Sequence, residues 1–188
     1  MSTQANDLTS RPVSAPEGIA IRRATVADAA ALAEFGARTF FETFAADNTP
    51  EDMQMHLRSA WHPDLQRAEI LAPDLDTLLA CDAQGLLAGF AQLDANHAPA
   101  CVATVRPVEL KRFYVDRPWQ GRGLARALMT QAENAARARG ARELWLGVFE
   151  RNTRAKIFYA KCGFERVGAQ VFVVGTDPQT DDVMLLRL

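Results

Sequence analysis

Apolar and polar positions near the start of the chain predict a strand followed by a helix. Residues 18–24 alternate between apolar and polar side chains, which is typical of an edge strand. Thr25 or Asp28 can then begin a helix by capping its first turn. Apolar residues, four of them phenylalanines, recur at helical spacing over 32–44, so this helix is expected to bury an aromatic face.

The segments that follow predict a second helix. Pro50 fits the first turn of a helix, and Asn48 or Thr49 can cap it. We expect Pro63 and Pro73 to break up the chain beyond this helix.

A hairpin and a loop are predicted next. Residues 77–93 contain two apolar runs joined by a turn at 82–85, which is the pattern of a hairpin. Residues 95–106 show no clear period and are expected to form a loop. Residues 108–115 resume a strand, in which simple alternation places Leu110, Arg112 and Tyr114 on one face.

The last third predicts helices and strands in alternation. A helix up to Gly140 leads to 143–149, a continuous apolar run typical of a buried strand. Asn152 caps a further helix that Gly163 ends. The end of the chain predicts a hairpin of strands 171–174 and 183–188 across a turn at 175–181.

The length of 188 residues suits one domain and is short for two. We expect residues 1–17 to be a frayed or disordered polar tail and residues 18–188 to form a single domain. Its mixture of helices and strands gives the fold class α/β (α+β).

Charge and composition narrow the class of protein. The net charge is −2, with 21 Lys and Arg against 23 Asp and Glu, so there is no basic excess for nucleic acid. No signal peptide is evident, and no apolar run approaches the ~18 residues of a membrane span. We therefore expect a cytoplasmic protein that binds neither nucleic acid nor membrane.

Cysteine and histidine give no sign of a metal site or a disulfide framework. Cys81, Cys101 and Cys162 are widely spaced and form no CxxC pair, which favours reduced thiols. His97 stands alone, far from the other histidines. No metal is expected.

The stretch D-R-P-W-Q-G-R-G-L-A-R, residues 116–126, predicts an anion site. A strand, two close glycines and a helix start leave backbone N–H groups free at the positive end of a helix dipole. A Walker loop is excluded because no GxxxxGK[ST] occurs, and the dinucleotide fingerprint fails because Arg126 occupies its third glycine position. A tight strand–helix turn without a ligand stays open on these residues alone.

The glycine loop closely resembles the Q/R-x-x-G-x-G/A signature of the GNAT superfamily of acyl-CoA-dependent N-acetyltransferases. The matching stretch is Q-G-R-G-L-A, which lies between L-K-R-F-Y-V-D-R-P-W and R-A-L-M. A second element of the superfamily is matched by L-W-L-G-V-F, followed by Asn152 and A-K-I-F-Y-A-K-C-G-F. The resemblance covers roughly residues 108–166. It implies a mixed, mostly antiparallel central sheet flanked by helices, with acetyl-CoA as co-substrate.

A narrower resemblance concerns the acceptor side. Three stretches are similar to the bacterial spermidine/spermine N-acetyltransferases of the PaiA type. They are F-F-E-T-F, N-T-P-E-D-M and the ending G-A-Q-V-F-V-V-G-T-D-P-Q-T-D-D-V-M. A polyamine is thus the implied acceptor, and nothing in composition or spacing shows it independently.

The superfamily resemblance implies which residues bind coenzyme A. Side chains of Gln120, Arg122 and Arg126 would add contacts to the pyrophosphate, and solvated arginines are the alternative. The loop would hold the pyrophosphate through the backbone N–H groups of Gly121, Arg122, Gly123, Leu124 and Ala125. The pantetheine would pair with backbone groups of Phe113, Tyr114 and Val115, and ordinary packing of their side chains in the core is the alternative.

The resemblance also implies a catalytic acid. Asn152, Lys156 and Tyr159 are spaced four and three apart, so they share one helical face, which would point to the cofactor. The hydroxyl of Tyr159 would protonate the leaving thiolate, and a buried, structural tyrosine is the alternative. Cys162 invites an acyl-enzyme route, but no histidine lies nearby and the family usually transfers directly.

The amine must lose a proton before it attacks, and Glu109 is the leading candidate base. It lies 11 positions before Gln120, the offset at which histone-acetylating relatives carry a glutamate. Ordered water, or a structural ion pair of Glu109 with Lys111 or an arginine, remains open. The carboxylates that would suit a cationic polyamine, or simply form a solvated face, are Glu34, Glu42, Asp47, Glu51 and Asp52.

Together these residues predict an acetyl-CoA-dependent N-acetyltransferase that works by direct attack in a ternary complex, with a polyamine such as spermidine or spermine favoured. A protein N-terminus, a lysine or an aminoglycoside-like amine is the alternative acceptor. A catalytically silent acyl-CoA-binding regulatory module is the alternative class, because fold does not establish turnover. Dimers are frequent in the superfamily, so a homodimer is a further expectation.

Overall fold

A computed structural model describes residues 14–96, 98–103 and 106–188 of the chain. Most of the tail expected over residues 1–17 lies outside the described residues, as does His97. Residues 18–188 remain our expected domain, and the described strands between Ala20 and Arg187 join in one sheet.

The sheet has seven strands in the order β1-β2-β3-β4-β5-β7-β6. Every neighbouring pair is antiparallel except β4 and β5, which run parallel, so the sheet is mixed and mostly antiparallel, as expected. The strands are β1 (Ala20–Arg23), β2 (Leu75–Cys81), β3 (Leu87–Asp94), β4 (Val108–Val115), β5 (Glu143–Phe149), β6 (Glu165–Val174) and β7 (Asp177–Arg187).

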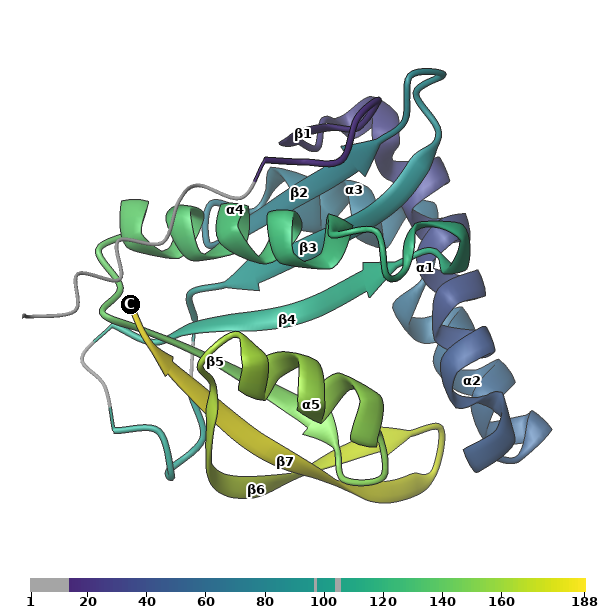
Figure 1. Cartoon of the computed structure of the whole chain (residues 1–188). Coiled ribbons are helices and arrows are strands. Elements are labelled where there is room, and N and C mark those ends of the chain that lie inside the picture. The colour runs from purple at the N-terminus through teal and green to yellow at the C-terminus, as the bar shows by residue number, and fades with distance from the viewer. Residues whose placement is uncertain (1–13, 97, 104–105) are drawn as a thin grey trace, which may run out of the picture.

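Helices cover both faces of this sheet (Figure 1). One face carries α4 and α5, and α1, α2 and α3 lie on the other side (Figure 1). The helices are α1 (Ala29–Phe44), α2 (Pro50–Ala60), α3 (Pro63–Leu71), α4 (Leu124–Ala138) and α5 (Thr153–Lys161). Two apolar cores result, because alternate residues of each central strand point to opposite faces.

The two cores can be followed in one strand pair. On the α4 side, Leu78 and Ala91 pack with Leu128 of α4. On the α1 side, Leu79 and Phe90 pack with helix residues such as Phe35. The aromatic face expected for the first helix is therefore real, although Phe41 is half exposed.

Pro63 and Pro73 interrupt the chain as expected, because α2 ends at Ala60, α3 begins at Pro63 and α3 ends at Leu71. Proline at the start of α3 lacks only an N–H that would be free anyway, and His62 caps this helix through Nδ1. The prediction for the turn at the end of the chain is wrong. The final hairpin turns at 175–176 rather than over 175–181. Its polar residues 177–182 belong to β7, where pairing with β6, and from Asp181 onward also with β5, outweighs their weak strand propensity.

Across the described part of the chain, no helix is both long enough and apolar enough to cross a membrane.

Candidate active site

An extra residue in β4 changes which side chains share a face. Leu110 pairs with Leu93 on β3 and Arg112 pairs with the adjacent Gln92, so Lys111 has no partner of its own. Such a bulge shifts the alternation of a strand. The predicted grouping of Leu110 with Arg112 is therefore wrong, and Leu110 shares the α4 side with Phe113.

The parallel strands β4 and β5 separate soon after they meet. They pair only through Val108 with Leu144 and Glu109 with Trp145, and beyond this point β4 bonds to β3 alone. The divergence is visible in Figure 1. Phe113 to Val115 thus have no strand partner on the side of β5 and face a gap in the middle of the sheet.

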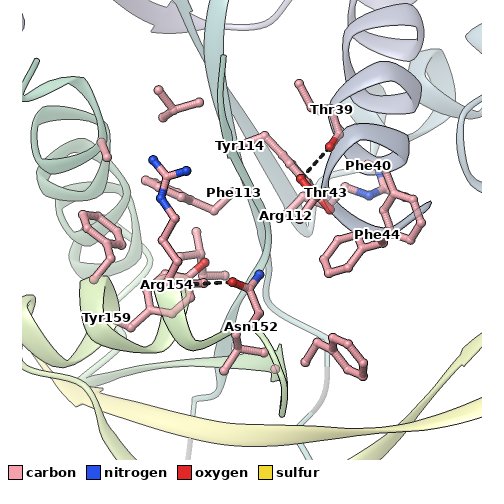
Figure 2. Close-up of a pocket in the computed structure, with 18 of the residues that line it drawn as sticks. Thr39, Phe40, Thr43, Phe44, Arg112, Phe113, Tyr114, Asn152, Arg154 and Tyr159 are labelled. Atoms are coloured by element: carbon pink, nitrogen blue, oxygen red, sulfur yellow. Dashed lines mark hydrogen bonds between the residues drawn. The ribbon is translucent and has the colours of Figure 1, made fainter. Parts of the chain in front are cut away.

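A cavity of about 390 Å³ occupies this gap. Residues from both faces of the sheet line it. Figure 2 shows Thr39, Phe40, Thr43 and Phe44 of α1 on one side and Asn152, Arg154 and Tyr159 on the other. A ligand entering from the α4 and α5 side can therefore meet one that enters from the α1 side.

The glycine loop opens onto this cavity at the start of α4. Gly121 and Gly123 have φ angles of 76° and 85°, a left-handed conformation that favours glycine. A Cβ at either position would meet no atom within 4 Å, so the backbone conformation, not crowding, calls for glycine. Gly123 caps α4 without a side chain, which leaves the first N–H groups of the helix free for an anion.

Three side chains surround this loop. Gln120 donates to the carbonyl of Val115 at 2.8 Å and accepts from Arg154 at 2.7 Å. The guanidinium of Arg122 lies 5.9 Å from the ring of Trp119. Arg154 lines the cavity and was missed by the sequence reasoning, although its position two residues after the cap Asn152 places it in the first turn of α5.

Two predicted cofactor residues point elsewhere in this structure. The guanidinium of Arg126 lies 4.0 Å from Glu133, along the helix and away from the glycine loop. Lys156 donates to Asp182 at 3.1 Å and to the carbonyl of Glu150 at 2.5 Å, and it does not line the cavity. The helical face shared by Asn152, Lys156 and Tyr159 is therefore only partly directed at the cavity.

Aromatic side chains hold the middle of β4 in place. Phe113 stacks on Phe158 of α5 with 5.7 Å between ring centroids, and Tyr114 stacks on Phe90 at 5.5 Å on the opposite face. These side chains pack in the two cores, which is the alternative to a ligand-binding role for them. On the side of β5 the backbone of both residues has no strand partner.

Tyr159 lines the cavity and is 8% exposed. Burial, with a smaller effect of Tyr114, raises the pKa of Tyr159 above its usual value, so its hydroxyl keeps the proton that an acid must give. Asn152 also lines the cavity, and its Oδ1 accepts from the N–H of Ala155 to cap α5 (Figure 2). Burial raises the pKa of the Cys162 thiol, and Cys162 does not line the cavity, which disfavours an acyl-enzyme.

Glu109 lies at the closed end of the gap, opposite Trp145. Burial, together with the nearby charge of Asp94, raises the pKa of Glu109 to about 7. Lys111 bonds to Asp94 and lies near Glu69 instead, so the ion pair with Lys111 considered for Glu109 does not form among the described residues. Glu109 itself does not line the cavity, and a water would have to link it to a substrate there.

The α1 side of the cavity contains a carboxylate that the sequence reasoning missed. Asp181 of β7 is 8% exposed and lines the cavity opposite Phe149. Burial, and the neighbouring charge of Asp182, raise the pKa of Asp181 to about 6. The apolar run at 183–186 directly after Asp181 could have indicated that Asp181 lies in a strand, but the sequence pattern predicts a turn at 175–181.

The acidic residues expected along the acceptor groove do not gather there. Glu42 alone of the five lines the cavity, and it lies near Arg38 and Arg117. Asp47 pairs with Arg151, and Asp52 accepts from the backbone N–H of Thr176. Over residues 14–96, 98–103 and 106–188, no group of three or more His, Cys, Asp or Glu side chains could hold a metal ion.

Residues 33–164 match the acetyltransferase (GNAT) family. The chain belongs to this family. It is therefore an acetyl-CoA-dependent N-acetyltransferase, as the glycine loop and the second motif predicted.

The similar proteins include an uncharacterized relative, a relative with a named acceptor and a solved structure. The chain is 35% identical over 164 residues to an uncharacterized N-acetyltransferase of Lactobacillus delbrueckii subsp. lactis, covering 87% of this chain and 94% of the relative. It is 31% identical to the aminoglycoside N(6')-acetyltransferase type 1 of Stenotrophomonas maltophilia, covering 81% and 90%. The crystal structure of the PaiA N-acetyltransferase of Thermoplasma acidophilum in complex with coenzyme A has a TM-score of 0.72 and 23% identity, covering 90% and 99%, which shows the shared fold.

Proposed function

We propose that the protein acetylates the primary amine of a small cationic molecule, by direct attack on acetyl-CoA in a ternary complex. The observation that carries this proposal is the cavity in the gap between β4 and β5, which residues from both faces of the sheet line. Holding an amine and a thioester together in one gap removes much of the entropic barrier to their reaction.

The α4 and α5 side fits acetyl-CoA, which supplies the activated acetyl thioester. The free N–H groups from Gly121 to Ala125 would hold the pyrophosphate at the positive end of the α4 dipole. Arg154 and Arg122 would add charge-assisted hydrogen bonds. Asn152 would contact the pantetheine, and Arg126 or Lys156 would contribute only after a change of side-chain orientation.

The edge of β4 would position the acetyl group. Backbone groups of Phe113 to Val115 have no strand partner on the β5 side, so they can pair with the pantetheine amides like an added strand. An N–H of Phe113 or Val115 aimed at the thioester carbonyl would stabilise the negative charge that develops on its oxygen.

Glu109 and Tyr159 would move the protons. Glu109, through a water, takes one proton of the ammonium, and the neutral nitrogen then forms the C–N bond. As the C–S bond breaks, the thiolate leaves with the electron pair and Tyr159 gives it a proton. The nitrogen loses its second proton as the amide forms, and through water this proton restores Tyr159. Near neutral pH Glu109 must be able to accept a proton and Tyr159 must carry one, and the raised pKa values of the two groups favour both conditions.

A polyamine such as spermidine or spermine is our first choice of acceptor, on the resemblance of the chain to PaiA-type enzymes. An aminoglycoside is the second, because a relative with that activity covers 81% of this chain. The cytoplasmic location and the homodimer expected from the sequence stay predictions.

A mass-spectrometric screen of amines with acetyl-CoA tests this proposal. The panel contains spermidine, spermine, kanamycin, simple monoamines and peptides with free N-termini or lysines. We expect acetylation of at least one small amine. Acetylation of peptides alone would overturn the small-molecule assignment, and acetylated kanamycin with unmodified polyamines would replace our first choice by our second.

A further inference from the structure

Four of the six charged side chains that line the cavity lie in ion pairs, and two do not. Lys111 and Arg112 lie against Glu69, and Glu42 lies 3.4 Å from Arg117. The described residues with charged side chains that line the cavity are Glu42, Lys111, Arg112, Arg117, Arg154 and Asp181. The two without an ion-pair partner are Arg154, on the α5 side, and Asp181, on the α1 side.

This division of charge matches two different ligands. The cation Arg154 lies beside the glycine loop, where a phosphate would be held. The carboxylate of Asp181 lies on the other face, among side chains that contribute no free positive charge. A buried carboxylate without a partner costs free energy, so a cationic ligand at this position would relieve that cost.

The carboxylate of Asp181 packs closely over the backbone of β5. Asp181 pairs with Phe149 on β5 and with Gln170 on β6. Gly147 lies two residues before Phe149 on the same face, and a Cβ there would lie 3.0 Å from Oδ2 of Asp181 and 2.6 Å from Nε2 of Gln170. A larger residue at position 147 would therefore displace Gln170 or the carboxylate.

Aromatic side chains line the cavity beside Asp181. Phe44 meets Phe149 edge to face with ring centroids 6.3 Å apart, and Phe40 contacts Phe44 at 4.8 Å. His56 stacks on Phe40 and meets the edge of Phe172. Aromatic faces attract cations as well as apolar chains, so the surface suits an ammonium group carried on an apolar body.

We propose that Asp181 holds the ammonium group of the acceptor before acetylation, against the aromatic wall of Phe40, Phe44, Phe149 and Phe172, and so selects amines carried on apolar chains. This inference rests on the proposed function and identifies the residue that recognises its substrate. Acetylation turns the ammonium group held by Asp181 into a neutral amide, so this group loses its attraction to Asp181.

The pH dependence of binding follows from the same carboxylate. Asp181 attracts an ammonium only when ionised, and its pKa is raised to about 6, so amine binding weakens as the pH falls through about 6. The other charged groups around it are Glu42, Glu109, Lys111, Arg112 and Asp182. Of these, Glu109 also has a raised pKa, about 7, so the pH dependence is assigned to Asp181 by its loss in Asp181→Asn.

Calorimetric binding of 2-phenylethylamine and of N-acetyl-2-phenylethylamine, each with coenzyme A present, tests the inference without turnover. The wild-type protein should bind the amine ~10-fold or more tightly than the amide, as expected for a charged hydrogen bond. Asp181→Asn should bring the two affinities to within about twofold of each other, since the remaining contacts are shared. Glu165→Gln, which removes an exposed carboxylate of β6, should keep the wild-type preference.

Gly147→Ala is the second variant, and it keeps the charge while displacing the side chains of Gln170 and Asp181 that pack over Gly147. It should weaken binding of the amine at least as much as binding of the amide. Wild-type protein that does not prefer the amine, or Asp181→Asn protein that keeps the preference, would overturn the inference. Amine acetylation could still be observed in those cases, so the proposed function would stand or fall separately in the mass-spectrometric screen.

Discussion

Glu109 of β4 pairs with Trp145 of β5, and β4 pairs with β5 at no later residue. The opening of the sheet therefore begins directly beyond the candidate base. One side of the opening has free backbone N–H groups at the start of α4, and the other side has aromatic residues of α1, β5 and β6. The proposed base thus lies where the opening begins, the proposed cofactor site on one side of it and the proposed acceptor site on the other.

Replacement of Glu109 by Gln should lower kcat by about 100-fold, because general-base catalysis contributes at least that much. The base acts when ionised, so wild-type kcat should rise with pH through about 7 and level off above it. The variant should lose this rise. A kcat–pH profile of Glu109→Gln that matches the wild type would instead assign the proton to ordered water.

Replacement of Tyr159 by Phe should lower kcat by ~100-fold or more while the KM for acetyl-CoA changes little, because only the hydroxyl is removed. Steady-state kinetics with both substrates varied makes this measurement. Cys162→Ala, one turn further along, should keep kcat within a few-fold, since Cys162 lies outside the cavity. The opposite pattern, an active Tyr159→Phe and an inactive Cys162→Ala, would favour an acyl-enzyme.

Replacement of Arg154 by Ala should raise the KM for acetyl-CoA by about 10-fold, the usual cost of losing a charged hydrogen bond to a phosphate. Arg151→Ala is the matched control, because Arg151 lies three residues earlier and contacts Asp47 and Phe149 instead. Arg126→Ala should have a smaller effect than Arg154→Ala. If Arg126→Ala has the larger effect, Arg126 turns from Glu133 to the phosphates when acetyl-CoA binds.

Replacement of Gly123 by Ala should lower Tm and raise the KM for acetyl-CoA. A left-handed φ costs a residue with a Cβ about 1 kcal/mol or more, and any relaxation moves the N–H groups of the loop. Gly18→Ala has a similar φ of 79° and open space around it, so it should lower Tm alone. Equal effects on KM from the two variants would show that the loop does not bind the cofactor.

Much of this fold follows from local patterns in the sequence. The alternation of 18–24 and the apolar run of 143–149 predict β1 and β5, and Asn152 and Gly163 predict the limits of α5. The glycine loop is equally local, because its conformation requires glycine whatever the surroundings. These predictions succeeded because the residues that decide the structure are neighbours in the chain.

Features that depend on distant partners were not predictable in the same way. The bulge at Lys111 is defined by the pairing of Leu110 and Arg112 with β3, which no local period reveals. Asp181 looks like a turn residue until β7 is seen to pair with both β5 and β6. Arg126 and Lys156 have suitable spacings for the cofactor, but Glu133 and Asp182 attract their charges.

The ternary-complex mechanism is the central claim, and initial-velocity kinetics tests it most directly. Acetyl-CoA and an amine acceptor identified in the screen are both varied, and the double-reciprocal plots are compared. Lines that intersect are predicted, because the gap between β4 and β5 brings both substrates together before reaction. Parallel lines, with an acetylated protein detectable by mass spectrometry before the amine is added, would contradict direct transfer.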